Sequence, residues 1–476
     1  MKYMFRIGIF ILCLIPFLSH SYYGLRSTEA TLTFSTVLEA LASDINFLKL
    51  NEGDRHETLP IIEQQLDYLV GAFQSESFYK EFGYKGVLGE NHHYKVTFKK
   101  IENTSDPQRK KIHYDFEGTV VFDKEAFGGK SYKRAIRKVP IKLPLEPDKI
   151  YDLSFSKKFN PCTDREYNSK EDFWYFWDPD LPQCRLKKDN INVVRTQGRL
   201  KRKKSTKLSY PEYDKLYSDN GNGETLDIAL FFGYMDDVDV HNFENSKRVK
   251  RRKKDDAYKA YRTIIKELQS RGFKKIVEKE LFRVYRDGNR DGKNSFAQGL
   301  NFLTQLEKTS TSKLKTPLNI RIQILLTDTS IESKDYTFHY YVKPAFENAD
   351  IILYDGHSGL GGNLDLTSRD FQDIQFNKDK YQIYFFNGCS TYPYFKGQFF
   401  TKKGGTHNLE IITSGLPTYS TTSVPNTFAF LDYFLEGKTR SYQKILQNLT
   451  QSNFEEEEDL IYLMGVNGDE DNIWKP

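Results

Sequence analysis

Two short stretches in the second half of the chain decide the fold: residues 351–359, IILYDGHSG, and residues 382–391, QIYFFNGCST. Each holds an apolar run of four residues that is followed by a polar residue, a glycine and then a residue with a reactive side chain, His357 or Cys389. Apolar runs this short are typical of buried strands. Similar runs lie at residues 228–232, 320–326 and 409–412, so the pattern predicts a sheet that begins after residue 223.

Helical segments separate these predicted strands. Apolar positions repeat at helical spacing between Ala257 and Leu268, and we also expect helices over residues 296–306 and 428–435. Strands that alternate with helices predict an α/β sandwich around a mostly parallel sheet. In such sheets the functional residues follow the carboxyl ends of the strands.

His357 and Cys389 each follow one of these predicted strands. If the two strands are parallel neighbours, both side chains emerge at the same edge, where the imidazole can assist a thiol nucleophile. Gly356 and Gly388 allow sharp turns at these points, and backbone N–H groups beside the turns could stabilise an oxyanion.

These two motifs resemble those of the caspase-like cysteine peptidases, which include caspases, gingipains, clostripain, legumain and separase. The resemblance covers about residues 223–452 and implies a cysteine endopeptidase with a polypeptide substrate and no required cofactor. His357 matches the histidine of that family and Cys389 matches its nucleophile. The resemblance also implies a loop that shapes the substrate pocket, with the residues Ser414, Gly415, Pro417, Thr418 and Tyr419.

The chain departs from this pattern after the histidine. The family has glycine there, whereas this chain has Ser358 and then Gly359. The amides of Ser358, Gly359 and Gly388 are the expected oxyanion donors. An alternative is a degenerate caspase-like domain in a non-catalytic binding or structural protein.

A serine hydrolase that uses Ser358 is a third hypothesis. The Gly-x-Ser-x-Gly motif would need glycine at the position of Leu360, and the downstream histidine for a triad would be His407.

The amino terminus has the three parts of a signal peptide. Lys2 and Arg6 precede an apolar run over residues 7–18, and small residues precede Tyr22. We therefore expect residues 1–21 to be removed and the protein to be exported to a periplasmic or extracellular location without a transmembrane anchor. In that oxidising environment Cys162 and Cys184 are expected to form a disulfide, which leaves Cys389 as a free thiol.

The predicted domains of the mature chain are a helix plus a β-rich domain over residues 22–194, a basic and polar linker over 195–222, and the α/β domain over 223–476. The helix is expected between Leu59 and Phe82. The formal net charge is +5, but twelve basic residues lie in two runs, 201–207 and 247–254. This local basicity does not predict a nucleic-acid-binding surface. The runs are interpreted as solvated loops, with binding to an anionic surface or cleavage by a trypsin-like protease as the alternatives.

Asp287, Asn289 and Asp291 occupy alternate positions of a calcium-loop pattern, with glutamine in place of the usual final glutamate. They are interpreted either as a low-affinity calcium site or as a polar surface turn. Asp236, Asp237, Asp239 and His241 follow the first predicted strand of the α/β domain and are interpreted as a solvated loop or a second cation site.

Overall fold

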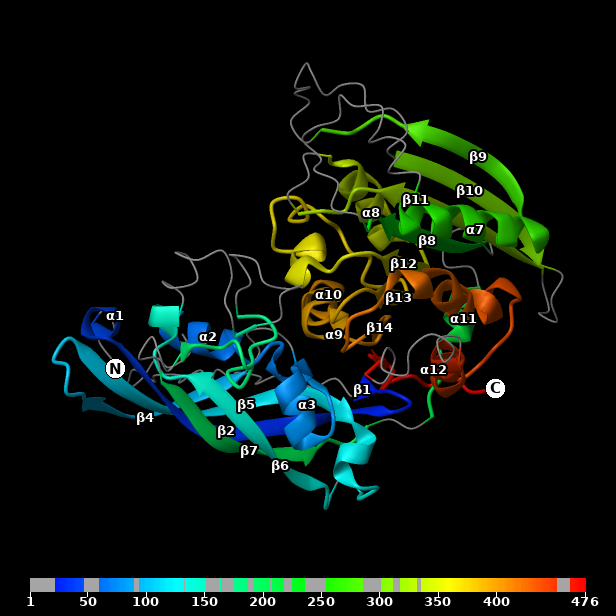
Figure 1. The fold of residues 1–476 in the computed structure, drawn as a ribbon. Helices are drawn as coiled ribbons and strands as arrows, with labels where there is room; N and C mark the ends of the chain where they lie inside the picture. Colours follow the sequence, from blue (N-terminus) through cyan, green and yellow to red (C-terminus); the bar gives the residue numbers. More distant parts are fainter. Residues whose placement is uncertain are drawn as a thin grey trace, which may run out of the picture.

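The computed structural model describes residues 22–46, 60–89, 94–131, 133–150, 162–163, 174–186, 192–205, 208–217, 225–235, 254–285, 301–310, 317–331, 335–451 and 463–476. Its strands join into one continuous sheet, in the order β3-β5-β2-β1-β15-β14-β13-β12-β8-β11-β10-β9 (Figure 1). Beside this path, β4 pairs with β5, β7 pairs with β2, and β6 pairs with β7.

The carboxy-terminal half of this sheet has a parallel centre. Five parallel strands lie in the order β11-β8-β12-β13-β14. Antiparallel strands β15, β10 and β9 extend the sheet on its two sides. The bounds are β8 (Thr225–Gly233), β9 (Lys274–Leu281), β10 (Asn301–Ser310), β11 (Leu318–Thr327), β12 (Ile351–Asp355), β13 (Gln382–Asn387), β14 (Leu409–Thr413) and β15 (Gly465–Asn467).

Helices cover both faces of these parallel strands. Helices α7, α11 and α12 share one hydrophobic cluster with β8 and β11, whereas α8 and α10 share another with β8, β12 and β13. Every residue of β12 and β13 is buried, as expected for strands with helices on both faces. The predicted α/β sandwich is therefore present. The helices are α5 (Tyr213–Tyr217), α7 (Asp256–Ser270), α8 (Thr337–Asn348), α9 (Thr391–Tyr394), α10 (Gly397–Lys403), α11 (Ser423–Leu435) and α12 (Tyr442–Gln451).

The amino-terminal half consists of antiparallel strands with helices α2 and α3 on one face (Figure 1). Alternate side chains of the long strands β2 and β5 are buried in a core that they share with these helices. The elements are β1 (Tyr22–Tyr23), β2 (Ser27–Leu41), α1 (Ala42–Asn46), α2 (Pro60–Asp67), α3 (Glu76–Phe82), β3 (Gly86–Leu88), β4 (Lys95–Asn103), β5 (Arg109–Asp123), β6 (Ile136–Pro144) and β7 (Val193–Arg202).

The short strand β1 connects the two halves. Tyr22 and Tyr23 pair with Asn467 and Val466 of β15, and Tyr23 also pairs with Thr28 of β2. The Tyr22 side chain is fully buried. The first residues of the expected mature chain are therefore part of the sheet.

Two sequence-based predictions of helices are wrong. Residues 301–306, the described part of the helix expected over 296–306, belong instead to strand β10, which pairs along its length with β11. The expected single helix from Leu59 to Phe82 is two helices, α2 and α3. Between them Gly71 lies so close to another segment that an added Cβ would be 2.5 Å from the amide nitrogen of Phe176.

The expected linker over residues 195–222 begins inside strand β7, which pairs with β6 and β2, and it also contains helix α5. Leu200 is buried in the core, while its neighbours Arg199 and Lys201 are exposed. Basic residues on the solvent face of a strand thus gave the segment the composition of a linker.

Candidate active site

Strands β12 and β13 place His357 and Cys389 at the same edge of the sheet. The strands are parallel neighbours, and their last residues, Asp355 and Asn387, are directly paired. His357 and Cys389 each lie two residues beyond that pair. The predicted arrangement of the two strand ends is confirmed.

The backbone leaves strands β12 and β13 through two glycines that lie close together. An added Cβ at Gly388 would lie 2.7 Å from the carbonyl oxygen of Gly356, and one at Gly356 would lie 3.3 Å from the Cα of Gly233. These distances leave no room for a side chain at Gly388. The turns that carry His357 and Cys389 are therefore in backbone contact.

The site lies where the strand order reverses. Strands β9, β10 and β11 lie on one side of β8, whereas the following strands β12, β13 and β14 lie on its other side. Strands β8 and β12 are therefore neighbours. Ligands bind in α/β sheets at such a switch point, outside the carboxyl ends of the strands. His357 follows β12 at this point, and its Nε2 atom lies 3.0 Å from the carbonyl oxygen of Met235, which follows β8.

The His357 turn is fixed through its backbone. The Tyr354 hydroxyl and the Asn363 side-chain amide both donate hydrogen bonds to the His357 carbonyl oxygen, each over 2.6 Å. The ring itself is exposed. Because a carbonyl oxygen only accepts hydrogen bonds, the contact with Met235 assigns the proton of a neutral ring to Nε2 and leaves Nδ1 as the basic nitrogen.

Cys389 is a free thiol whose Sγ atom donates a hydrogen bond to the carbonyl oxygen of Thr418 over 3.6 Å. Burial raises the pKa of this thiol above its ordinary value. Among the described residues, the side chains of His357 and Cys389 thus hydrogen-bond to backbone carbonyl oxygens and not to each other. In this arrangement the sulfur is protonated at neutral pH.

A buried polar network holds the two strand ends together. Asn387 donates a hydrogen bond to Asp355 over 2.7 Å, Ser423 of α11 donates to the other carboxylate oxygen over 2.9 Å, and Asn426 donates to Asn387 over 3.0 Å. Burial raises the pKa of Asp355 to about 6. The sequence analysis missed this network, although Asp355 and Asn387 occupy equivalent positions two residues before His357 and Cys389.

The expected oxyanion residues lie on both turns. Ser358 is buried, with 5% of its surface exposed, and precedes the 3-10 helix η4 (Gly359–Leu364). Gly359 has a φ of 52°, and an added Cβ there would lie 2.2 Å from the Asn363 side-chain oxygen. Gly388 belongs to the Cys389 turn.

The expected substrate loop follows β14 and runs beside Cys389, but its residues differ in exposure. Ser414 and Gly415 are buried, and the Ser414 carbonyl oxygen accepts a hydrogen bond from the amide of Tyr392. Pro417 and Thr418 are half-buried and Tyr419 is exposed. Ser414 and Gly415 are therefore placed to support the loop, and Thr418 is the member that contacts the thiol.

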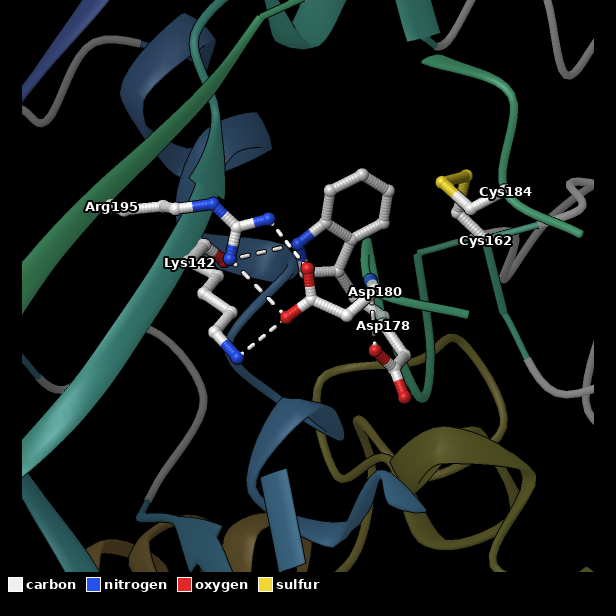
Figure 2. The surroundings of a disulfide bond; sticks show 7 residues. Lys142, Cys162, Asp178, Asp180, Cys184 and Arg195 are labelled. Carbon is white, nitrogen blue, oxygen red and sulfur yellow. Dashed lines mark hydrogen bonds and ion pairs between the residues drawn. A yellow bond between two sulfur atoms is a disulfide. The ribbon is translucent and has the colours of Figure 1, made fainter. Parts of the chain in front are cut away.

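The predicted disulfide between Cys162 and Cys184 is present (Figure 2). The predicted calcium residues Asp287, Asn289 and Asp291 lie outside the described residues, as do Asp236, Asp237, Asp239 and His241. Within the part of the chain that the structure describes, no three histidine, cysteine or carboxylate side chains are grouped to hold a metal ion.

Comparison with known proteins gives no relative: no protein-family model, curated protein or solved structure matches the chain. None of the helices in the described ranges is long and apolar enough to span a membrane.

Proposed function

We propose that the chain is an exported cysteine endopeptidase of the caspase-like type, in which Cys389 attacks the peptide carbonyl and His357 is the base. The observation that carries this proposal is the in-register pairing of β12 and β13, which puts both residues at the same edge of the sheet, with His357 at the switch point and Cys389 on the next strand. A free thiol in a chain whose other described cysteines form a disulfide fits the same function. The disulfide is also typical of exported proteins.

The raised pKa of Cys389 favours general-base catalysis over a preformed thiolate–imidazolium pair. Substrate binding would release the thiol from Thr418, and His357 Nδ1 would accept the proton as the Sγ–carbon bond forms. The amides of Ser358, Gly359 and Gly388 would stabilise the oxyanion. His357 would then protonate the leaving amine, and water would hydrolyse the thioester to release the acid and restore the thiol.

The serine hydrolase hypothesis has less support. Ser358 is buried, and the Tyr354 and Asn363 side chains anchor the preceding carbonyl group. His407 precedes β14 and therefore lies near the amino-terminal ends of the parallel strands, at the edge opposite to Ser358. These two residues are not placed to form a triad.

A non-catalytic protein remains the second candidate function, because the thiol proton is donated to Thr418 and the thiol pKa is raised. In that function Cys389 would be a structural thiol of the turn. Cleavage of peptides separates the two candidates.

The test is cleavage of a mixed peptide library, with and without calcium, by the wild type and three variants. We expect cleavage by the wild type, loss of cleavage in Cys389→Ser and His357→Ala, and nearly full activity in Ser358→Ala, because Ser358 supplies only its backbone. Circular dichroism checks that each variant is folded. Cleavage that survives Cys389→Ser but is lost in Ser358→Ala would establish the serine hydrolase, and no cleavage by any folded protein would favour the non-catalytic function.

A further inference from the structure

The residue after Cys389 has an unfavourable backbone conformation. Ser390 has a φ of 48°, in the left-handed region, which a non-glycine residue adopts only when its surroundings impose it. Its side chain does not cap the following helix α9. Its amide donates a hydrogen bond to the carbonyl oxygen of Leu416. That bond holds the backbone and does not determine where the hydroxyl group points.

The hydroxyl group of Ser390 faces the amino-terminal half of the molecule. The Tyr175 hydroxyl donates a hydrogen bond to Ser390 Oγ over 3.1 Å, and the Gln74 side-chain amide donates to the same atom over 3.5 Å. All three residues are buried. A segment far away in the sequence therefore contacts the residue next to the candidate nucleophile.

Tyr175 belongs to a segment, residues 174–186, that we call the aromatic loop. The disulfide closes this loop at Cys184, and the Asp178 amide donates a hydrogen bond to the Cys162 carbonyl oxygen over 2.8 Å. Asp180 binds Lys142 of β6 and Arg195 of β7 (Figure 2). These contacts fix the loop to the amino-terminal strands.

The approach of the aromatic loop to α2 and α3 is equally specific. Phe176 has a φ of 53°, and its amide nitrogen would lie only 2.5 Å from a Cβ added to Gly71, which lies between α2 and α3. The Tyr175 and Phe176 rings are packed edge to face at a centroid distance of 4.5 Å. Tyr175 is thus packed against residues of the amino-terminal half, and its hydroxyl contacts Ser390.

A second set of contacts is made by Tyr392, which lies three residues after Cys389 in the same turn. The Tyr392 hydroxyl donates a hydrogen bond to the buried carboxylate of Glu29 in β2, and its ring packs edge to face against Tyr22 at 4.8 Å. The ammonium group of Lys396 lies 3.8 Å from the centroid of the Tyr392 ring. The amino-terminal half therefore contacts the turn at two points.

We infer that the aromatic loop positions the thiol of Cys389 for reaction through the hydrogen bond from Tyr175 to Ser390, which makes Tyr175 a positioning residue. This inference rests on the proposed function for its effect on catalysis. The amino-terminal half then helps to orient the nucleophile of the α/β half.

The test compares Tyr175→Phe with Tyr114→Phe in the full chain, with the disulfide formed. Tyr114 is the matched control because it is a buried tyrosine of the same half whose hydroxyl donates to Gln65. We expect Tyr175→Phe to lower kcat about tenfold with little change in KM, and Tyr114→Phe to leave kcat unchanged. Both variants should lose similar amounts of thermal stability.

The pH profile of Cys389 alkylation by iodoacetamide gives a second readout. When the turn is loosened, the thiol becomes more exposed, so its alkylation should become faster and the midpoint of the profile should move down toward that of free cysteine. Mass spectrometry locates the label. A purely global loss of stability, as expected in Tyr114→Phe, would lower the melting temperature and leave this midpoint at the wild-type value.

Ser390→Ala removes the acceptor of the same hydrogen bond, and it should match Tyr175→Phe in both readouts, with no added effect in the double variant. Additive effects, or a Tyr175→Phe variant that behaves as Tyr114→Phe does, would overturn the inference. If the wild type cleaves no peptide but its alkylation still depends on Tyr175, the proposed function fails and the positioning role stands.

Discussion

Asp355 is a buried carboxyl group at the candidate site, and its surroundings shift its pKa. It is 1% exposed and accepts hydrogen bonds from Asn387 and Ser423. Burial disfavours the carboxylate more than these two bonds favour it, so the pKa is raised to about 6. The network therefore holds a carboxyl group that can change charge in mildly acidic solution.

An acid whose pKa is higher in the folded state binds its proton more tightly there than in the unfolded chain. The stability that protonated Asp355 contributes is present below about pH 4 and is lost as pH rises through about 6. We predict that the free energy of unfolding of the wild type, relative to that of Asp355→Asn, falls by about 2 kcal/mol between pH 4 and pH 7.

Urea denaturation of both proteins at several pH values measures this difference, and the comparison cancels the titration of the other buried acids. Asn at this position cannot accept both hydrogen bonds in the same way, so the absolute stabilities will differ. The test is therefore how the difference in unfolding free energy between the two proteins changes with pH. A difference that is independent of pH would contradict the raised pKa of Asp355.

At the scale of elements, the ends of β12 and β13 depend on the close contact of their two turns. We predict that Gly388→Ala destabilises the protein by about 3 kcal/mol, because the new Cβ would lie 2.7 Å from the Gly356 carbonyl oxygen and must push the turns apart. Gly83→Ala is the control. Gly83 has a φ of 84° but no heavy atom within 4 Å of an added Cβ, so its cost should be only about 1 kcal/mol.

Urea unfolding measures both variants, and peptide cleavage should be lost only in Gly388→Ala. Equal costs for the two substitutions would show that the turns can move apart freely.

The sequence predicted the strands whose apolar runs are bounded by polar residues. Strands β8, β11, β12, β13 and β14 are examples, and their carboxyl ends located His357 and Cys389. It did not predict β7, because the exposed face of that strand is basic, or the break between α2 and α3, because Gly71 contacts the distant Phe176. Contacts between distant segments have no local sequence signal.

The same reason explains which parts of the site were missed. Ser423 and Asn426 reach the strand ends from α11, and Tyr175 reaches Ser390 from the aromatic loop. Asp355 and Asn387 could have been found, because polar residues at the last position of two buried strands need partners. Their side chains are hydrogen-bonded to each other across the two strands.

At the scale of the whole molecule, the two halves share one sheet through β1, and the disulfide closes the loop that contacts both. We predict that replacing Cys162 and Cys184 together with alanine lowers the free energy of unfolding by about 3 kcal/mol, as expected for a loop of this length. Urea unfolding under non-reducing conditions measures this change. The wild type unfolded with a reductant is the control, and it should lose a similar amount.

No loss of stability in the double variant would show that the aromatic loop is held by Asp178, Asp180 and its own packing alone.

The central claim is that Cys389 is a nucleophile that His357 activates. The most direct measurement is mass spectrometry of the intact protein and of its peptides after incubation with a set of peptidyl acyloxymethyl ketones, which alkylate cysteine nucleophiles in peptidase sites. We predict one adduct per chain, on Cys389, in the wild type and in Ser358→Ala, and none in His357→Ala at the same reagent concentration. Absence of the adduct in the wild type, or equal labelling without His357, would contradict the claim.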